Sequence, residues 1–179
     1  DSAENVKKNF YLKTISYSNT KFNTNMLWSW MASLREIKQQ EEMVLMRKAI
    51  DMSCAGHLEV MKALVPGMNE YHAQAIAEYM FKKEGSEYVG YGSIVGGGEN
   101  SCILHYITNR KKLEGKNLMV IDAGAEYHGY TADITRTLPV DGTFSKEEKE
   151  IYNTVLEAQE NGIKACKAGS DFRAPHAAA

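Results

Sequence analysis

The middle of this 179-residue chain differs in character from the segments on either side of it. Residues 86–140 carry most of the glycines together with many β-branched residues, and the runs 118–125 and 130–138 have the composition of β-strands. The flanking segments repeat apolar residues at three- and four-residue steps, which is the period of an amphipathic α-helix. The order helix, helix, strands, helix predicts an α+β domain in which helices cover one face of a mostly antiparallel sheet.

Three helices are predicted around this middle segment. The first covers residues 34–64, and the second has Asn69 as its cap and ends at Gly85. The third begins with a capping box formed by Ser145 and Glu148. The residues expected on the buried faces are Met46, Ile50, Cys54, Leu58, Met61 and Leu64 in the first helix, Ala73, Ile76, Ala77, Met80 and Phe81 in the second, and Tyr152, Val155, Leu156, Gln159 and Ile163 in the third.

Charge and composition exclude several classes of function. The formal net charge is −2 with acids and bases interspersed, so no broad basic face is available for nucleic acid. The apolar runs are too short to span a membrane and the N-terminus has no signal-peptide pattern, which together favour a cytoplasmic protein that binds no membrane. Three widely spaced cysteines, Cys54, Cys102 and Cys166, are expected to be small buried hydrophobes rather than disulfide or zinc ligands. Residues 1–33 show no sustained period and are expected to be the end of a preceding domain or a linker.

The two predicted strands flank a turn and carry two aspartates. If the chain turns at Tyr127-His128, partners across the hairpin have numbers that sum to 255, which places Asp122 opposite Asp133. The same register pairs Ile121 with Ile134, and Ala123 with Ala132, on the other face of the sheet. Apolar residues then meet apolar residues while the two carboxylates face each other.

Two opposed carboxylates in a strand pair repel each other, so some feature must offset the repulsion. A shared proton would do so by raising the pKa of one carboxyl group, and a divalent cation would do so while both stay ionised. In the alternative interpretation one aspartate faces solvent and the other caps a turn. The residues alone leave these three interpretations open.

A longer pattern surrounds the aspartates. It consists of SIVGGGENSCILHY at 93–106 and VIDAGAEYHGYTADITRTLPV at 120–140, preceded by LREIKQQEEMVLMRKAID at 34–51. These runs resemble the Xaa-Pro aminopeptidase and Xaa-Pro dipeptidase group of pita-bread metallopeptidases. The resemblance implies that residues 34–179 are the N-terminal half of a pita-bread catalytic domain, in which helices cover a mostly antiparallel sheet.

The resemblance also implies roles for three residues. Asp122 would be a bidentate ligand of one metal ion, Asp133 would bridge two metal ions, and His105 would bind substrate and assist proton transfer at the wall of the site. The remaining ligands of the family, a His and two Glu, come from downstream of the hairpin and are absent from this chain. For a lone His in an apolar run such as ILHY, a hydrogen-bonded core residue is the other interpretation.

The implied cofactors are two divalent metal ions, Mn²⁺ by family habit, with Co²⁺ or Zn²⁺ as substitutes. The implied reaction is hydrolysis of the bond between an N-terminal residue and a following proline, by an aminopeptidase or a dipeptidase that forms a homo-oligomer when full length. The alternative function is a non-catalytic binding or scaffold module of the same fold.

A run of three glycines precedes His105 in the sequence. Gly96-Gly97-Gly98 lacks the Lys-Ser/Thr of a phosphate-binding loop, and no helix is expected after it. We expect this segment to be a backbone bend that brings Glu99, Asn100 and His105 to the site.

Overall fold

The computed structural model describes residues 24–179, so residues 1–23 of the predicted N-terminal segment 1–33 lie outside the described residues. The chain divides into two compact units, residues 1–43 and residues 44–179. In the first unit, helix α2 covers Thr24–Glu36. This helix passes through the boundary predicted between residues 33 and 34, and that boundary stays a prediction.

The helix predicted for residues 34–64 is wrong at its start. The chain leaves the helical conformation at residues 37–39, and α3 then covers Gln40–Ala63. Glu42 Oε2 accepts a hydrogen bond from the Gln39 N–H at 2.6 Å, which is the return half of a capping box. Glu41 and Glu42 also lie in the first turn of α3, where negative charge is favourable. Local capping at Gln39 therefore separates two helices that the apolar period joined.

The buried face predicted for α3 is also wrong. Ile50, Leu58 and Met61 are 40%, 54% and 41% exposed, and all three cysteines are exposed rather than buried. The residues that α3 buries are Ala49, Met52, Ser53, Gly56, His57 and Val60. Small residues decide the outcome, because a Cβ atom at Gly56 would lie 2.3 Å from the Phe81 ring of the next helix. Helix α3 therefore packs the face with small residues against the core, and the apolar residues on its other face stay exposed.

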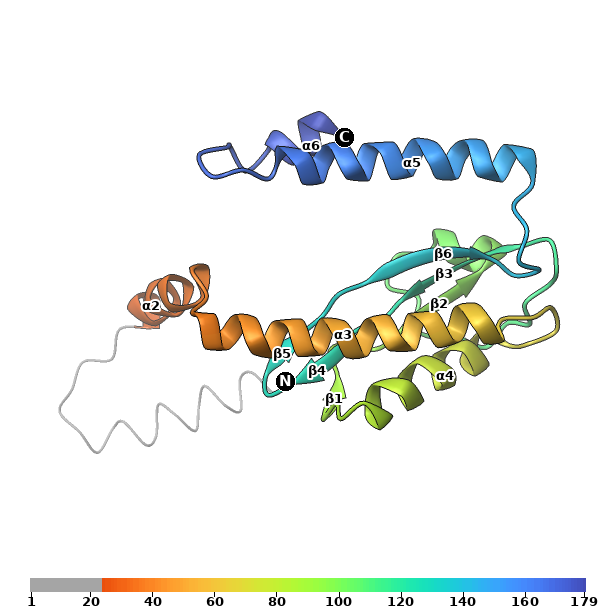
Figure 1. The fold of residues 1–179 in the computed structure, drawn as a ribbon, viewed down its shortest axis with the longest axis horizontal. Helices are drawn as coiled ribbons and strands as arrows, with labels where there is room; N and C mark the ends of the chain where they lie inside the picture. Colours follow the sequence, from red (N-terminus) through yellow and green to blue (C-terminus); the bar gives the residue numbers. More distant parts are fainter. Residues whose placement is uncertain (1–23) are drawn as a thin grey trace. The chain divides into compact units, whose positions relative to one another are not determined.

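Helix α4 covers Glu70–Lys83, and its predicted face is confirmed in the main. Ala73, Ala77 and Phe81 are buried, while Ile76 is partly buried against the core. The helix ends before Gly85, whose φ of +103° is the left-handed conformation common just past a helix end. In Figure 1, α3 and α4 run side by side along the strands.

Within the described residues, six strands form two antiparallel three-stranded sheets. The strand order is β1-β4-β5 in one sheet and β2-β3-β6 in the other. The strands are β1 Tyr88–Val89, β2 Ile94–Gly97, β3 Leu118–Asp122, β4 Ala125–Tyr127, β5 Tyr130–Thr131 and β6 Thr135–Pro139. Each strand predicted around the aspartates is therefore divided in two, and β1 and β2 were not predicted at all.

The core lies between the sheets and helices α3 and α4. Its buried apolar residues are Met52, Val60, Ala73, Ala77, Phe81, Val95, Leu113, Met119, Ile121, Ala123, Ala125 and Val140. Within residues 24–179, no helix is long and apolar enough to cross a membrane.

Helix α5 covers Lys146–Ala165, and its predicted capping box is confirmed. Ser145 Oγ accepts the Glu148 N–H at 3.2 Å, and Glu148 Oε2 accepts the Ser145 N–H at 2.7 Å. Its predicted buried face is wrong: no residue of α5 is buried, and Val155 and Ile163 are 62% and 64% exposed. Among the described elements α5 packs mainly on the short helix α6, Ala174–Ala178. Its apolar residues Tyr152, Val155 and Leu156 face β3 and β6 across an open cavity, which leaves Val155 and Leu156 exposed.

Candidate active site

The hairpin that carries the aspartates turns one residue later than predicted. Tyr127 pairs with Tyr130, which leaves His128 and Gly129 as a two-residue turn with φ values of 50° and 83°. Two positive φ values in a two-residue loop are typical of a type I′ turn, which matches the twist of the flanking strands. Partners consequently sum to 257 rather than 255, and Asp122 pairs with Thr135 instead of Asp133.

Because the register differs by two residues, each side chain keeps its face of the sheet. The predicted apolar pairs are replaced by others: the Ala123 N–H donates to Ile134, and the Ala132 N–H donates to Ala125. The direct opposition of the two aspartates was wrong. Their placement near each other on the same side is supported by a third residue.

Tyr91 connects the two carboxylates. Its hydroxyl group donates to Asp122 Oδ1 and lies 3.3 Å from Asp133 Oδ1, which it also reaches as a donor. Burial raises the pKa of Tyr91, and the hydrogen bond to Asp122 and the charges of both aspartates raise it further. The phenol therefore stays protonated and keeps a donor between two acidic groups.

Sequence reasoning missed Tyr91, although a signal was present. Tyr91 stands three residues before Ile94, and Ile94 pairs with Asp122 across β2 and β3. A prediction of β2 would have placed this tyrosine beside the aspartate. The short, glycine-rich strand Ile94–Gly97 hid that pairing, because glycine is depleted in strands.

A glycine allows the hairpin to close between the aspartates. A Cβ atom at Gly124 would lie 1.8 Å from the carbonyl oxygen of Ala132, which is shorter than any tolerated contact. The chain segments that carry Asp122 and Asp133 therefore approach each other more closely here than side chains would permit. The break between β3 and β4 falls at this position.

His105 shares a cavity with both aspartates. A cavity of about 310 Å³ is lined by Tyr91, Ile94, His105, Asp122 and Asp133, among others. His105 has a φ of 56°, the left-handed region that non-glycine residues seldom adopt and that clusters at functional sites. Its predicted place beside the carboxylates is where the structure puts it, and its catalytic role stays a prediction.

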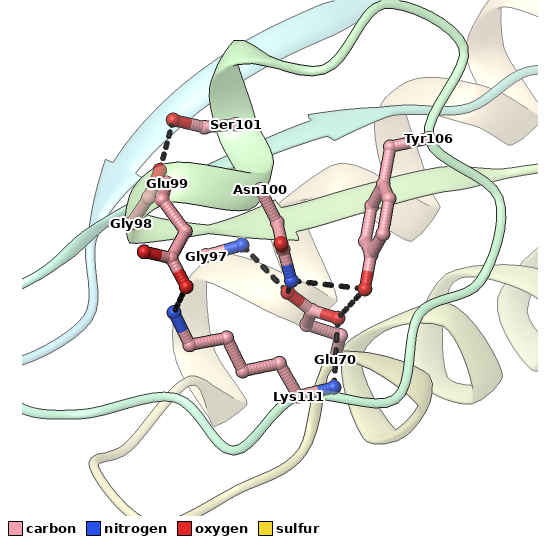
Figure 2. A network of polar contacts seen from close by, with 8 residues as sticks. All are labelled: Glu70, Gly97, Gly98, Glu99, Asn100, Ser101, Tyr106 and Lys111. Carbon is pink, nitrogen blue, oxygen red and sulfur yellow. Dashed lines mark hydrogen bonds and ion pairs between the residues drawn. The ribbon is translucent and has the colours of Figure 1, made fainter.

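The prediction for the glycine bend, residues 96–98, is confirmed for Asn100 and wrong for Glu99. A 3₁₀ helix, η1, opens at Gly98 and covers Gly98–Cys102, so the expectation that no helix follows the glycines was wrong. Asn100 lines a second cavity with His105 and Asp122. Glu99 does not reach the site: it is exposed, and it forms an ion pair with Lys111 at 2.8 Å. In Figure 2 the Glu99 side chain points toward Lys111, with which it is paired.

Two buried side chains of helix α3 bind the backbone of the aspartate segment. Ser53 Oγ accepts the Ala125 N–H at 2.8 Å, and His57 Nε2 lies 3.1 Å from the Ala123 carbonyl oxygen. Ser53 and His57 are four residues apart on a helix, which rises about 6 Å over that length. Ala123 and Ala125 are two residues apart in extended chain, which spans about 6.6 Å, so each helix residue reaches one of them. Burial lowers the pKa of His57, which favours the neutral imidazole.

A buried carboxylate organises the loop that leads to His105. Glu70, the first residue of α4, is fully buried and accepts four hydrogen bonds (Figure 2). Oε1 accepts from the Gly97 N–H and Asn100 Nδ2, both at 2.9 Å. Oε2 accepts from the Tyr106 hydroxyl at 2.8 Å and the Lys111 N–H at 2.9 Å. Burial and the contact with Glu70 raise the pKa of Tyr106, which keeps its hydroxyl a donor.

The donors of the cavity are those that hard divalent cations prefer. Two carboxylates lie close enough to share one hydroxyl donor, and carboxylate oxygens bind Mg²⁺, Ca²⁺ and Mn²⁺. Between Thr24 and Ala179, no group of three or more His, Cys, Asp or Glu side chains is placed to hold a metal ion. The two aspartates thus fit part of a metal site.

The α+β fold thus brings two carboxylates and a histidine to one cavity. The chain belongs to metallopeptidase family M24, whose family profile matches residues 44–179. The fold class expected from the sequence, a partial pita-bread fold, is thereby confirmed, as is the resemblance to the Xaa-Pro peptidase group.

Individual relatives agree with the family. Over 139 residues the chain is 41% identical to the Xaa-Pro aminopeptidase of Escherichia coli, which covers 78% of this chain and 32% of that protein. Aminopeptidase PepP of Pseudomonas aeruginosa has a TM-score of 0.78 and 42% identity, and covers 79% of this chain and 32% of that one. Proline aminopeptidase P II of Yersinia pestis has a TM-score of 0.81 and 38% identity, and covers 83% and 34%. The chain therefore spans about a third of the length of these relatives.

Proposed function

We propose that this chain is part of a metallopeptidase that hydrolyses the peptide bond between an N-terminal residue and a following proline. The observation that carries the proposal is the cavity in which Asp122, Asp133 and His105 meet beside Tyr91. The names of the relatives, Xaa-Pro aminopeptidases, favour an aminopeptidase over a dipeptidase. The retained aspartate pair argues against a non-catalytic scaffold, which has no use for adjacent carboxylates that repel each other.

The proposed cofactors are two divalent metal ions, with Asp122 and Asp133 among their ligands. Mn²⁺ suits an oxygen-rich ligand set, and a zinc-substituted form of the Escherichia coli relative is among the similar structures. When bound, such ions lower the pKa of a water molecule and polarise the scissile carbonyl group. Cytoplasmic location and homo-oligomer formation stay predictions.

Side chains of this chain orient the proposed ligands, bind the substrate and form the wall of the cavity. Tyr91 keeps the two carboxylates oriented through its donor hydroxyl. His105 lines the cavity wall, and in this proposal it binds the substrate and moves a proton at the scissile bond. Ile94 and Ile107 give the same cavity an apolar wall, which suits a proline ring. Proline has no N–H to donate, so recognition by shape replaces a backbone hydrogen bond.

Replacement of His105 tests the proposed function. In the full-length protein, His105→Ala should lower kcat for an Xaa-Pro peptide about 100-fold, the usual effect of losing a general acid or base. The metal content of the purified variant, measured by mass spectrometry, should stay close to that of the parent. His176→Ala, on the exposed helix α6, is the matched control and should leave kcat unchanged. Unchanged turnover in His105→Ala would return this residue to a structural role.

A further inference from the structure

Glu70 connects the two ends of the loop that carries His105. Its Oε1 binds Gly97 and Asn100, at the start of the segment 97–111, and its Oε2 binds Tyr106 and Lys111, at the end (Figure 2). The Glu70 N–H also donates to the Lys111 carbonyl oxygen at 2.9 Å. One buried side chain thus connects both ends of the loop directly.

His105 is the residue of this loop that most needs such support. It is exposed, and its φ of 56° lies in the left-handed region. A non-glycine residue in that region costs about 1 kcal/mol or more and persists only where the surrounding structure over-determines it. Tyr106, the next residue, is hydrogen-bonded to Glu70 directly and to Asn100 Nδ2 at 2.9 Å. The constraint on His105 therefore comes through its neighbour.

We propose that Glu70 is a positioning residue that holds His105 in its reactive orientation by binding both ends of the loop 97–111. The inference rests on the proposed function, because it assumes that His105 acts on the substrate. Glu70 is not itself a catalytic residue. It is fully buried, it lines neither of the two cavities that His105 shares with Asp122, and all four groups around it are loop donors.

A glutamine cannot replace this carboxylate, for a reason that the geometry makes plain. Each oxygen accepts from one backbone N–H, that of Gly97 at Oε1 and that of Lys111 at Oε2. The amide of Gln has one acceptor and one NH₂ group. Tyr106 and Asn100 can reorient to meet an NH₂ group, but the two backbone donors cannot. Either orientation of the amide therefore leaves one buried N–H facing another, and one end of the loop must move.

The test compares variants of the full-length protein. Glu70→Gln should lower kcat on an Xaa-Pro peptide by about 10- to 100-fold, the size of effect that small misplacement of a reacting group produces. KM and metal content should change little. Tyr106→Phe removes only one of the four donors and should lower kcat less. Glu84→Gln, which changes an exposed acid at the end of α4 and outside the loop, is the matched control and should leave kcat unchanged.

A double-mutant cycle separates positioning from general loss of structure. If Glu70 acts through His105, then Glu70→Gln should lower kcat no further once His105 is already Ala. Multiplied losses in the double variant would overturn the proposal, as would unchanged kcat in Glu70→Gln when His105→Ala is impaired. If Glu70→Gln does not fold, the same cycle with Tyr106→Phe decides. Unchanged kcat in His105→Ala alone would return His105 to a structural role, whereas a parent protein that does not hydrolyse Xaa-Pro peptides would overturn the proposed function.

Discussion

Tyr91 and His57 contact different parts of the aspartate segment. Tyr91 reaches the carboxylates themselves, while His57 binds the backbone at Ala123, next to Asp122. The first contact controls where the acidic oxygens lie, and the second controls the strand that carries them. The two residues therefore have separable effects, one on metal binding and one on stability.

Tyr91→Phe should weaken metal binding. Loss of the hydroxyl removes the donor shared by Asp122 and Asp133, and groups that orient metal ligands contribute about 10- to 100-fold in affinity. Titration of the metal-free full-length protein with Mn²⁺ in a calorimeter would measure the change. Tyr88→Phe is the matched control, because Tyr88 is 75% exposed on β1. Equal affinity in the Tyr91 variant would show that its hydroxyl does not orient the ligands.

His57 should make stability depend on pH. Burial lowers the pKa of His57 in the folded state below its usual 6.5, so the unfolded chain binds more protons in this range. The contribution is fully present above pH 6.5 and is lost as the pH falls below that value, by at most about 1.4 kcal/mol per pH unit. Urea unfolding between pH 7.5 and 5.5 should show this slope in the parent and a reduced slope in His57→Gln. His176→Gln should keep the slope of the parent; an equal slope in all three proteins would contradict the assignment.

The aspartate hairpin shows how far sequence reasoning reaches at the level of an element. The alternation around Asp122 and Asp133 correctly predicted extended chain on both sides of a turn and a common side for the carboxylates, although each predicted strand is divided in two. The register was wrong by two residues, because its choice depended on which dipeptide forms the turn. His128-Gly129 turns as type I′ with a histidine where Asn or Asp is usual, so the turn signal was weak. The predicted apolar pairs could not correct this, since a two-residue slip also pairs Ala123 with an apolar residue, Ile134.

The face of α3 failed for a different reason. A helix with apolar residues on two sides offers two possible buried stripes, and periodicity alone does not rank them. The structure buries the side with Gly56 and Ser53, which allow close approach and bond the hairpin backbone. His105, Asp122 and Asp133 were predicted from the family-like pattern at residues 93–106 and 120–140. Tyr91 and Glu70 were missed because their partners are 31 to 42 and 27 to 41 residues away along the chain.

Gly124→Ala should destabilise the fold strongly. The added methyl group would lie 1.8 Å from a backbone oxygen, so the strands must separate at the aspartates, at a cost of about 2 to 3 kcal/mol or more. Gly92→Ala is the matched control, because its methyl group would meet Ile107 at an ordinary 3.5 Å. Denaturant unfolding of both variants measures the difference. If Gly124→Ala were as stable as the control, the close approach of the strands would be wrong.

At the scale of the whole molecule, the chain spans about a third of its relatives, and within residues 24–179 the cavity brings two carboxylates together but no group of three metal-ligating side chains exists. Two ligands leave most of the coordination of two hard cations to water, so affinity should be low. In saturating Mn²⁺, residues 1–179 should hydrolyse an Xaa-Pro peptide at least about 1,000-fold more slowly per mole than the Escherichia coli relative, since the nucleophile is not generated. Comparable activity would mean that this account of the ligands is incorrect.

The bonds from Ser53 and His57 to the hairpin also have a consequence for how the site comes into being. They join residues 72 and 66 positions apart, so forming them closes long loops and carries a large entropic cost. The β4–β5 hairpin closes through a two-residue turn and can form within microseconds on its own. Contacts of long sequence separation slow folding, so the docking of α3 belongs to the late part of the reaction. The two aspartates, which flank this hairpin on its two sides, would then come near each other early. They would acquire their final spacing only when α3, far upstream in the sequence, packs against the hairpin.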